Sequence, residues 1–290
     1  MVFGFMKKKE EKTEKTEGIS TVQTDRYANQ RHIIGEEGQE KLKKAGVVIV
    51  GCGAIGVSAA HYLAAAGVGR IKLIDNDYVN ITDIQKQPLY TMSDIGKRKA
   101  FVIADRLKNI NPEIIAMPNT MRIRRDTVSK FLNEDIIIDA SNDLPTHYLL
   151  SDACVLSGKK TVFASASAFE GQVTVFDSKN GPCYRCIFPS PTLQTKEGIL
   201  GMVIGVVGLI QATEAVKLIL GSGNTLTGRM LSFSLNDMRF LETDIEKDEN
   251  CAVCGKNPTV KELIDYDEFC GTKKHIEPAA VIFEKGTTPS

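Results

Sequence analysis

The segment from Val47 to Asp75 constrains the fold more than any other part of the chain. Residues 47–50 are a short, wholly apolar and β-branched run, which predicts a strand covered on both faces of a sheet. Gly51-Cys-Gly-Ala-Ile-Gly56 follows at once, and then come a helix over about 57–66 and a second strand over 71–74. This order predicts one βαβ unit of a parallel sheet.

The glycine loop of this unit predicts a nucleotide site. Gly51, Gly53 and Gly56 allow the backbone to approach phosphates closely, and the helix that follows offers unpaired N–H groups at its N-terminus. Asp75 ends the second strand, where its carboxylate can accept hydrogen bonds from ribose hydroxyls. These features favour a nucleotide but do not distinguish NAD from ATP, so a dehydrogenase stays open at this point.

The pattern of alternating elements continues beyond this unit. Helices are predicted over 97–109, 126–133 and 145–157, and they alternate with strands over 114–117, 136–138 and 161–163. We therefore expect a doubly wound, Rossmann-like α/β fold with a mostly parallel sheet. After Gly171, strands over 172–177 and 228–236 predict an antiparallel C-terminal extension of the same sheet.

Charge and hydropathy limit the classes of partner. Lys+Arg and Asp+Glu both number 36, so no net charge favours nucleic acid or a membrane surface. The N-terminus lacks a secretory signal, which predicts a cytoplasmic protein, and residues 1–24 are predicted to be a disordered tail. The stretch 199–220 is apolar enough to span a bilayer, but Gln211, Glu214 and Lys217 within it favour a buried core helix instead.

Four of the seven cysteines form two Cys-x-x-Cys pairs, at Cys183 with Cys186 and at Cys251 with Cys254. Two such pairs are typical of one tetrahedral zinc ion with four thiolate ligands, a closed structural site without a position for water. A redox pair is the alternative interpretation. The metal would hold a loop near the sheet against the C-terminal segment.

Several motifs together resemble one family, the MoeB/ThiF/HesA group of ubiquitin-activating-enzyme-like adenylyltransferases. The resemblance extends over roughly residues 25–271. Besides the glycine loop and the cysteine pairs, it rests on Arg26-Tyr27 with Gln30, on 66–69, on Asp75-x-Asp77, on Gln85-x-Gln87, on Asn111-Pro112, on 171–176, on 205–214 and on 254–266.

The resemblance implies ATP-dependent adenylation of a carrier protein's C-terminal Gly-Gly carboxylate, with release of pyrophosphate and with Mg²⁺ as cofactor. It implies a ThiF-type ATP-binding domain over 25–255 and a C-terminal extension over 256–290. The residues that it places at the site are Gly51, Gly53, Gly56, Asp75, Asp77, Asp83, Lys86, Lys99, Asn142 and Asp143, with Lys99, Lys86 and Asp143 as catalytic groups.

Four of these positions depart from the family pattern. The family's arginine finger falls on Asn29, with Arg31 two residues on, and its phosphate-binding arginine falls on Lys86. An asparagine is replaced by Asp83, and the magnesium-binding aspartate falls on Asn142, between Asp139 and Asp143. An amide is a weaker magnesium ligand than a carboxylate, and Lys86 supplies charge without a bidentate fork.

The crossover loop, 188–197, has Gln194, Thr195 and Lys196 where thioester-forming relatives carry a cysteine. We therefore expect adenylation without covalent capture. The resemblance implies two partners, a ubiquitin-like sulfur-carrier protein with a Gly-Gly tail and a second copy of this chain in a homodimer. Two alternatives stay open: adenylation of a small-molecule or peptide carboxylate, and a catalytically degenerate nucleotide-binding partner protein.

Overall fold

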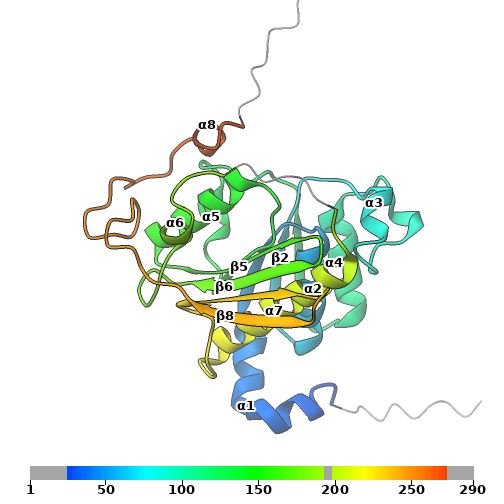
Figure 1. The fold of residues 1–290 in the computed structure, drawn as a ribbon. Coiled ribbons are helices and arrows are strands. Elements are labelled where there is room, and N and C mark those ends of the chain that lie inside the picture. The colour runs from blue at the N-terminus through cyan, green and yellow to red at the C-terminus, as the bar shows by residue number, and fades with distance from the viewer. Residues whose placement is uncertain (1–24, 193–197, 273–290) are drawn as a thin grey trace, which may run out of the picture.

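A mixed sheet of eight strands runs through the described part of the chain, residues 25–192 and 198–272 of a computed structural model (Figure 1). The strands are β1 (Gly46–Val50), β2 (Arg70–Ile74), β3 (Ile115–Asn119), β4 (Ile136–Asp139), β5 (Lys160–Ser167), β6 (Glu170–Phe176), β7 (Arg229–Ser234) and β8 (Arg239–Asp244). The helices are α1 (Ala28–Lys44), α2 (Ala54–Ala66), α3 (Ile81–Ile84), α4 (Lys99–Ile110), α5 (Leu144–Ser157), α6 (Tyr184–Ile187), α7 (Gly201–Leu220) and α8 (Tyr266–Phe269), with 3₁₀ turns η1 (Met92–Asp94) and η2 (Val128–Phe131).

The strand order β3-β2-β1-β4-β5-β6-β7-β8 confirms the predicted doubly wound sheet. β3, β2, β1, β4 and β5 are parallel, and β6, β7 and β8 continue the sheet with antiparallel pairing, as predicted. Val50 is level with Ile74 of β2 and with Asp139 of β4. The carboxyl ends of these three strands therefore meet at one edge of the sheet, where open α/β sheets bind ligands.

β1 shows why the chain folds around this sheet. All five of its residues are buried, and alternate side chains enter two separate cores. Val47 and Ile49 pack with α2, α4 and α7 on one face, whereas Val48 and Val50 pack with α5 and α8 on the other. Figure 1 shows α5 and α8 on one side of the sheet and α7 on the opposite side. A strand covered on both faces needs apolar residues at every position.

Two elements differ from the sequence-based prediction. The expected helix over 126–133 is only the short η2, because Thr127 Oγ1 accepts a hydrogen bond from the Arg124 amide and holds a turn there. β8 was not predicted, since all six of its residues are exposed and its sequence lacks a buried face. The expectations for residues 1–24 concern a segment outside the described residues.

α7 is a core helix, as predicted for the apolar stretch 199–220. Among the described residues it is the one helix long and apolar enough to cross a membrane. Gln211 is fully buried and its side-chain amide donates to the carbonyls of Asp139 and Val162, at 2.8 and 3.1 Å. Glu214, also buried, forms an ion pair with Lys217. The Gln211 side-chain N–H groups and the Glu214 carboxylate therefore have protein partners, whereas Gln211 Oε1 has no hydrogen-bond partner among the described residues.

We predict that Gly208→Ala destabilises the fold. A Cβ there would lie 2.5 Å from the Ile55 carbonyl oxygen and 2.6 Å from Ser58 Cβ, in the tight contact between α7 and α2. Overpacking of this kind costs about 1–3 kcal/mol of unfolding free energy.

Gly205→Ala in the same helix is the matched control, because its Cβ meets nothing within 4 Å. Alanine is the better helix former, so this variant should keep or raise the unfolding free energy by up to about 1 kcal/mol. Denaturant unfolding of both variants measures the difference, and equal stability of the two would contradict the packing argument.

Candidate functional site

A cavity of about 640 Å³ opens at the carboxyl ends of β1, β2 and β4. It lies where the strand order turns back, which is the ligand-binding position of doubly wound sheets. Five residues predicted for the nucleotide site line it, namely Gly51, Asp75, Asp77, Asn142 and Asp143.

Asp75 joins the end of β2 to the glycine loop. Its carboxylate accepts from the backbone N–H of Cys52 and from that of Asp77, each at 2.7 Å. Burial raises the pKa of Asp75, and the two amide hydrogen bonds and the nearby Lys99 oppose that rise only in part. Each carboxylate oxygen has a further lone pair. Asp75 can therefore hold the loop and still accept from a ribose hydroxyl.

The glycines of the loop have different physical roles. Gly51 has a φ of 98°, and a Cβ there would lie 2.4 Å from the Ala140 carbonyl oxygen of the β4 end. A Cβ on Gly56 would lie 1.9 Å from the Gly51 carbonyl oxygen. Gly53 precedes α2, whose first turn has no side-chain cap, and a Cβ there would meet nothing within 4 Å. Gly51 and Gly56 let the loop close, and Gly53 leaves space before the helix N-terminus.

Lys99, Lys86 and Asp83 form a cluster beside the cavity and are not part of its lining. Lys99 Nζ lies 3.2 Å from Asp83 Oδ2 and 4.0 Å from Asp77 Oδ2, and Lys86 Nζ lies 3.5 Å from Asp83 Oδ1. Burial favours a higher pKa for Asp83, but the Asn80 amide and the two lysines outweigh it and lower that pKa. Lys99 thereby connects the cluster to Asp77, which does line the cavity.

Asn142 and Asp143 lie at the cavity wall after β4. Asp143 caps α5, since its Oδ1 accepts from the Thr146 amide at 3.1 Å and from Thr146 Oγ1 at 2.8 Å. Behind them, Asp139 is buried and pairs with His147 Nδ1 at 2.7 Å. Burial favours a lower pKa for His147, yet the Asp139 carboxylate outweighs it and raises that pKa.

Sequence reasoning missed several residues of the site. Arg122 and Asp267 line the cavity and form an ion pair of 3.6 Å, and Thr272 lies beside them. His147 was also missed, because no motif marks a histidine that pairs with a buried strand-end carboxylate. Arg31, considered as a substitute finger, is paired with Asp25 and Glu36 at 3.1 and 2.9 Å. The prediction for Gln194, Thr195 and Lys196 concerns residues outside the described ranges.

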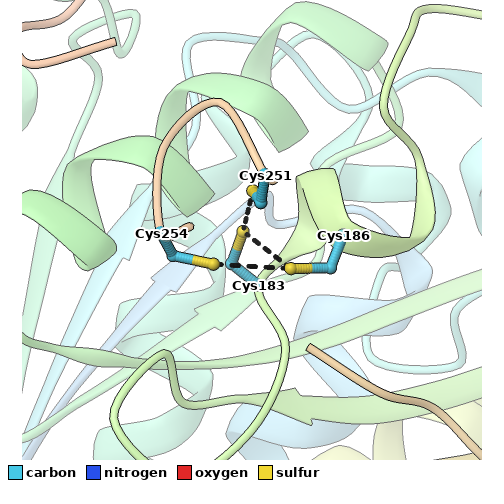
Figure 2. Close-up of side chains that lie close together, drawn as sticks. All are labelled: Cys183, Cys186, Cys251 and Cys254. Atoms are coloured by element: carbon cyan, nitrogen blue, oxygen red, sulfur yellow. Dashed lines mark hydrogen bonds between the residues drawn. The ribbon is translucent and has the colours of Figure 1, made fainter. Parts of the chain in front are cut away.

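The four predicted cysteines meet in one cluster (Figure 2). Their sulfur atoms all lie within 4.8 Å of one another, with 3.8 Å between Cys183 and Cys186, 3.5 Å between Cys183 and Cys251 and 3.4 Å between Cys186 and Cys254. A tetrahedral zinc site with Zn–S bonds of about 2.3 Å has S–S edges of about 3.8 Å. Number, chemistry and spacing of the thiolates therefore fit a structural zinc ion.

The cysteine cluster is tied to the C-terminal segment by a buried polar group. Arg185 lies between two of the cysteines, and its guanidinium donates to both carboxylate oxygens of Asp152, with Nε–Oδ1 and Nη2–Oδ2 distances of 2.9 Å. The Tyr266 hydroxyl donates to the same carboxylate at 2.8 Å. Asp152 is fully buried and Tyr266 nearly so, so residues beyond the second cysteine pair pack into the core next to α5.

The fold and site together define a doubly wound α/β domain with a cavity at the strand ends and a cluster of four cysteines that fits a zinc ion. The chain belongs to the ThiF family, whose sequence model matches residues 27–253.

A sulfur carrier protein adenylyltransferase from Thermus thermophilus is 40% identical over 263 residues, which cover 86% of this chain and 97% of that protein. MOCS3 from Aedes aegypti, an adenylyltransferase and sulfurtransferase, is 40% identical over 83% of this chain. The chain spans 57% of the length of that MOCS3 protein. These relatives identify the chain as an adenylyltransferase of the ThiF family.

Solved structures agree on the fold. Escherichia coli MccB, solved with ATP, superposes with a TM-score of 0.73 at 24% identity, over 80% of this chain and 75% of that one. PaaA superposes with a TM-score of 0.67 at 20% identity, over 81% of this chain and 86% of the other. At these identities the likeness concerns the architecture alone.

We predict that the purified protein carries one zinc ion per chain and that Cys254→Ser lowers this content sharply, because a thiolate ligand is lost. Cys270→Ser is the matched control: Cys270 is buried but belongs to the core beside α5 and not to the cluster. Elemental analysis after gel filtration gives the metal content. Equal zinc in both variants would contradict the assignment.

The raised pKa of His147 predicts a pH-dependent contribution to stability. A base with a raised folded-state pKa stabilises fully below its unfolded pKa of about 6.5, and this stabilisation is lost as the pH rises through the folded-state value. The stability difference between the wild type and His147→Asn should therefore shrink as the pH increases above neutrality.

His61 is the control for this titration, because burial lowers its pKa. The contribution of His61 to the free energy of unfolding should change in the opposite direction: its burial destabilises the fold at low pH, and this destabilisation is lost as the pH rises to about 6.5. Urea unfolding of His147→Asn and His61→Asn from pH 5 to 9 measures both differences, and parallel curves for the two variants would refute the Asp139–His147 pairing as the cause.

Proposed function

We propose that this chain transfers AMP from ATP to the C-terminal carboxylate of a ubiquitin-like sulfur-carrier protein, forming an acyl-adenylate and pyrophosphate. The main support is the strand-end cavity bounded by Gly51, Asp75 and Asp143. The 40% identity with the Thermus sulfur carrier protein adenylyltransferase, over 97% of that protein, supports the same acceptor.

The proposed nucleotide position follows from the loop. The phosphates lie at the uncapped first turn of α2, where Gly53 leaves space and where unpaired N–H groups favour anions. The ribose lies at Asp75. Asn142 and Asp143 are the residues that would hold Mg²⁺ through their side-chain oxygen atoms, since Asp143 uses only Oδ1 for its hydrogen bonds to Thr146.

The reaction adds an anionic carboxylate to an anionic α-phosphate, so cations must neutralise the developing charge. Lys99 and Lys86 are the proposed phosphate partners, in addition to Mg²⁺. Asp83 holds both ammonium groups next to the cavity before nucleotide binds. A triphosphate carries a larger negative charge than Asp83 and would compete with it for these two ammonium groups.

Exposed apolar side chains on the edge strand support a protein acceptor over a small molecule. β8 is the last strand of the sheet, and Phe240 and Leu241 on it are 54% and 65% exposed, next to Met238 at 72%. An edge strand with apolar side chains favours contact with another protein. We propose that the carrier binds this edge while its C-terminal tail reaches the nucleotide, and that the enzyme acts as a homodimer in the cytoplasm.

We predict that Lys99→Ala lowers the rate of ATP–pyrophosphate exchange with a cognate carrier by about 10²–10³-fold, the usual effect of removing one transition-state charge partner. Lys108→Ala is the matched control, since Lys108 lies on the same helix, is exposed and pairs only with Asp105 in the described structure. It should exchange at the wild-type rate.

The alternative functions give different results in the same assay. AMP transfer to small carboxylates, with none to any Gly-Gly-ended carrier of the same genome, would replace the proposed acceptor. ATP binding without exchange would favour a degenerate partner protein, an interpretation supported by the altered positions Asn29, Asp83, Lys86 and Asn142. A protein that binds no ATP with any metal would refute nucleotide chemistry altogether.

A further inference from the structure

The C-terminal segment beyond the second cysteine pair reaches the nucleotide cavity. Asp267 on α8 and Thr272 just after it line the cavity, although both lie beyond residues 27–253, which the ThiF family model matches. Figure 1 shows α8 close to α5. Pro145 and Thr146 in the first turn of α5 also line the cavity. The cavity is therefore closed on one side by a segment that the family model does not cover.

The position of α8 is fixed from inside the fold. Tyr266 donates to the buried Asp152 carboxylate, and the ring of Phe269 lies 4.4 Å from the Arg185 guanidinium. On the other side of the helix, Asp267 forms the ion pair with Arg122, and Thr272 Oγ1 donates to Asp267 Oδ1 at 3.3 Å. The Asp267 carboxylate is therefore held at the cavity by its own backbone and by two neighbouring side chains.

The direction of a bound nucleotide determines which part meets this carboxylate. β3 follows β2 on the side away from β1. With the phosphates at the glycine loop after β1 and the ribose at Asp75 after β2, we therefore infer that the base is directed toward the loop after β3. That loop contributes Met121, Arg122 and Ile123 to the cavity, and Asp267 pairs with the middle one of these three. Asp267 thus lies at the base end, where a carboxylate accepts from an amino group and repels a carbonyl oxygen.

We propose that Asp267 is a specificity-determining residue that accepts a hydrogen bond from the exocyclic amino group of adenine, with Arg122 and Thr272 as positioning residues. This inference rests on the proposed function, because it requires a nucleotide in the cavity. It assigns base recognition to the C-terminal segment and not to the glycine-loop half of the domain.

The test compares two nucleotides of equal charge. ATP and purine riboside triphosphate have the same ribose and phosphates, but the second lacks the amino group. Full-length, zinc-loaded protein should bind ATP about tenfold more tightly in calorimetric titrations with Mg²⁺, the size expected for one hydrogen bond to a charged group. Asp267→Ala should bring the ratio of the two dissociation constants close to one. Asp267→Asn keeps a carbonyl acceptor and should therefore retain part of the preference for ATP over purine riboside triphosphate.

Glu268→Ala is the matched control, because it removes a carboxylate from the next residue of α8, which is exposed and not part of the cavity wall. It should keep the wild-type ratio. A general charge effect cancels in the ratio, since both nucleotides carry the same phosphates. An unchanged ratio in Asp267→Ala, or equal binding of the two nucleotides by the wild type, overturns the inference while nucleotide binding itself stands. Wild-type protein that binds neither nucleotide overturns both proposals.

Discussion

The close approach of the glycine loop to the end of β4 is the constraint on which the site depends. Gly51 turns the chain at the end of β1, where only a residue without a Cβ fits against the Ala140 carbonyl. The Val50 carbonyl accepts from the Ala140 amide at 2.9 Å, and the Gly51 amide donates to the Ile74 carbonyl at the same distance. These contacts bring the ends of β1, β2 and β4 to one edge, so residues distant in sequence, Asp75 and Asn142, share a cavity.

The charge of that cavity argues for a cation in the reaction. Among the described residues, four carboxylates line it, those of Asp75, Asp77, Asp143 and Asp267, and Arg122 is the only lysine or arginine in that part of the lining. A triphosphate entering such a site is repelled unless divalent metal and nearby ammonium groups compensate its charge. The Lys99–Lys86–Asp83 cluster provides such groups just outside the lining. In the proposed reaction, the ion pairs with Asp83 hold both ammonium groups close to the cavity.

How much of this the sequence predicts depends on whether the signal is local. The βαβ unit, the mostly parallel sheet and the cysteine cluster were predicted because strand burial, glycine spacing and Cys-x-x-Cys pairs are each read within a few residues. β8 was missed because an exposed edge strand has no buried face to reveal it. His147, Arg122 and Asp267 were missed for other reasons. Arg122 and Asp267 are brought together only by the tertiary fold, since they lie 145 residues apart in sequence. His147 lies only eight residues from Asp139, but no motif marks a histidine that pairs with a buried strand-end carboxylate.

The two cysteine pairs explain how so distant a segment comes to the cavity. Cys183 and Cys186 flank Arg185 on α6, and Cys251 and Cys254 bring the chain back to α6 after β8. From there only a short stretch leads to Tyr266, which bonds the same Asp152 carboxylate that Arg185 holds. Leaving that carboxylate buried with fewer partners costs free energy, so the three side chains favour a single position of α8. A metal at the cysteine cluster would therefore do more than join two loops: it would limit where the C-terminal segment can lie, and Asp267 and Thr272 of that segment line the cavity.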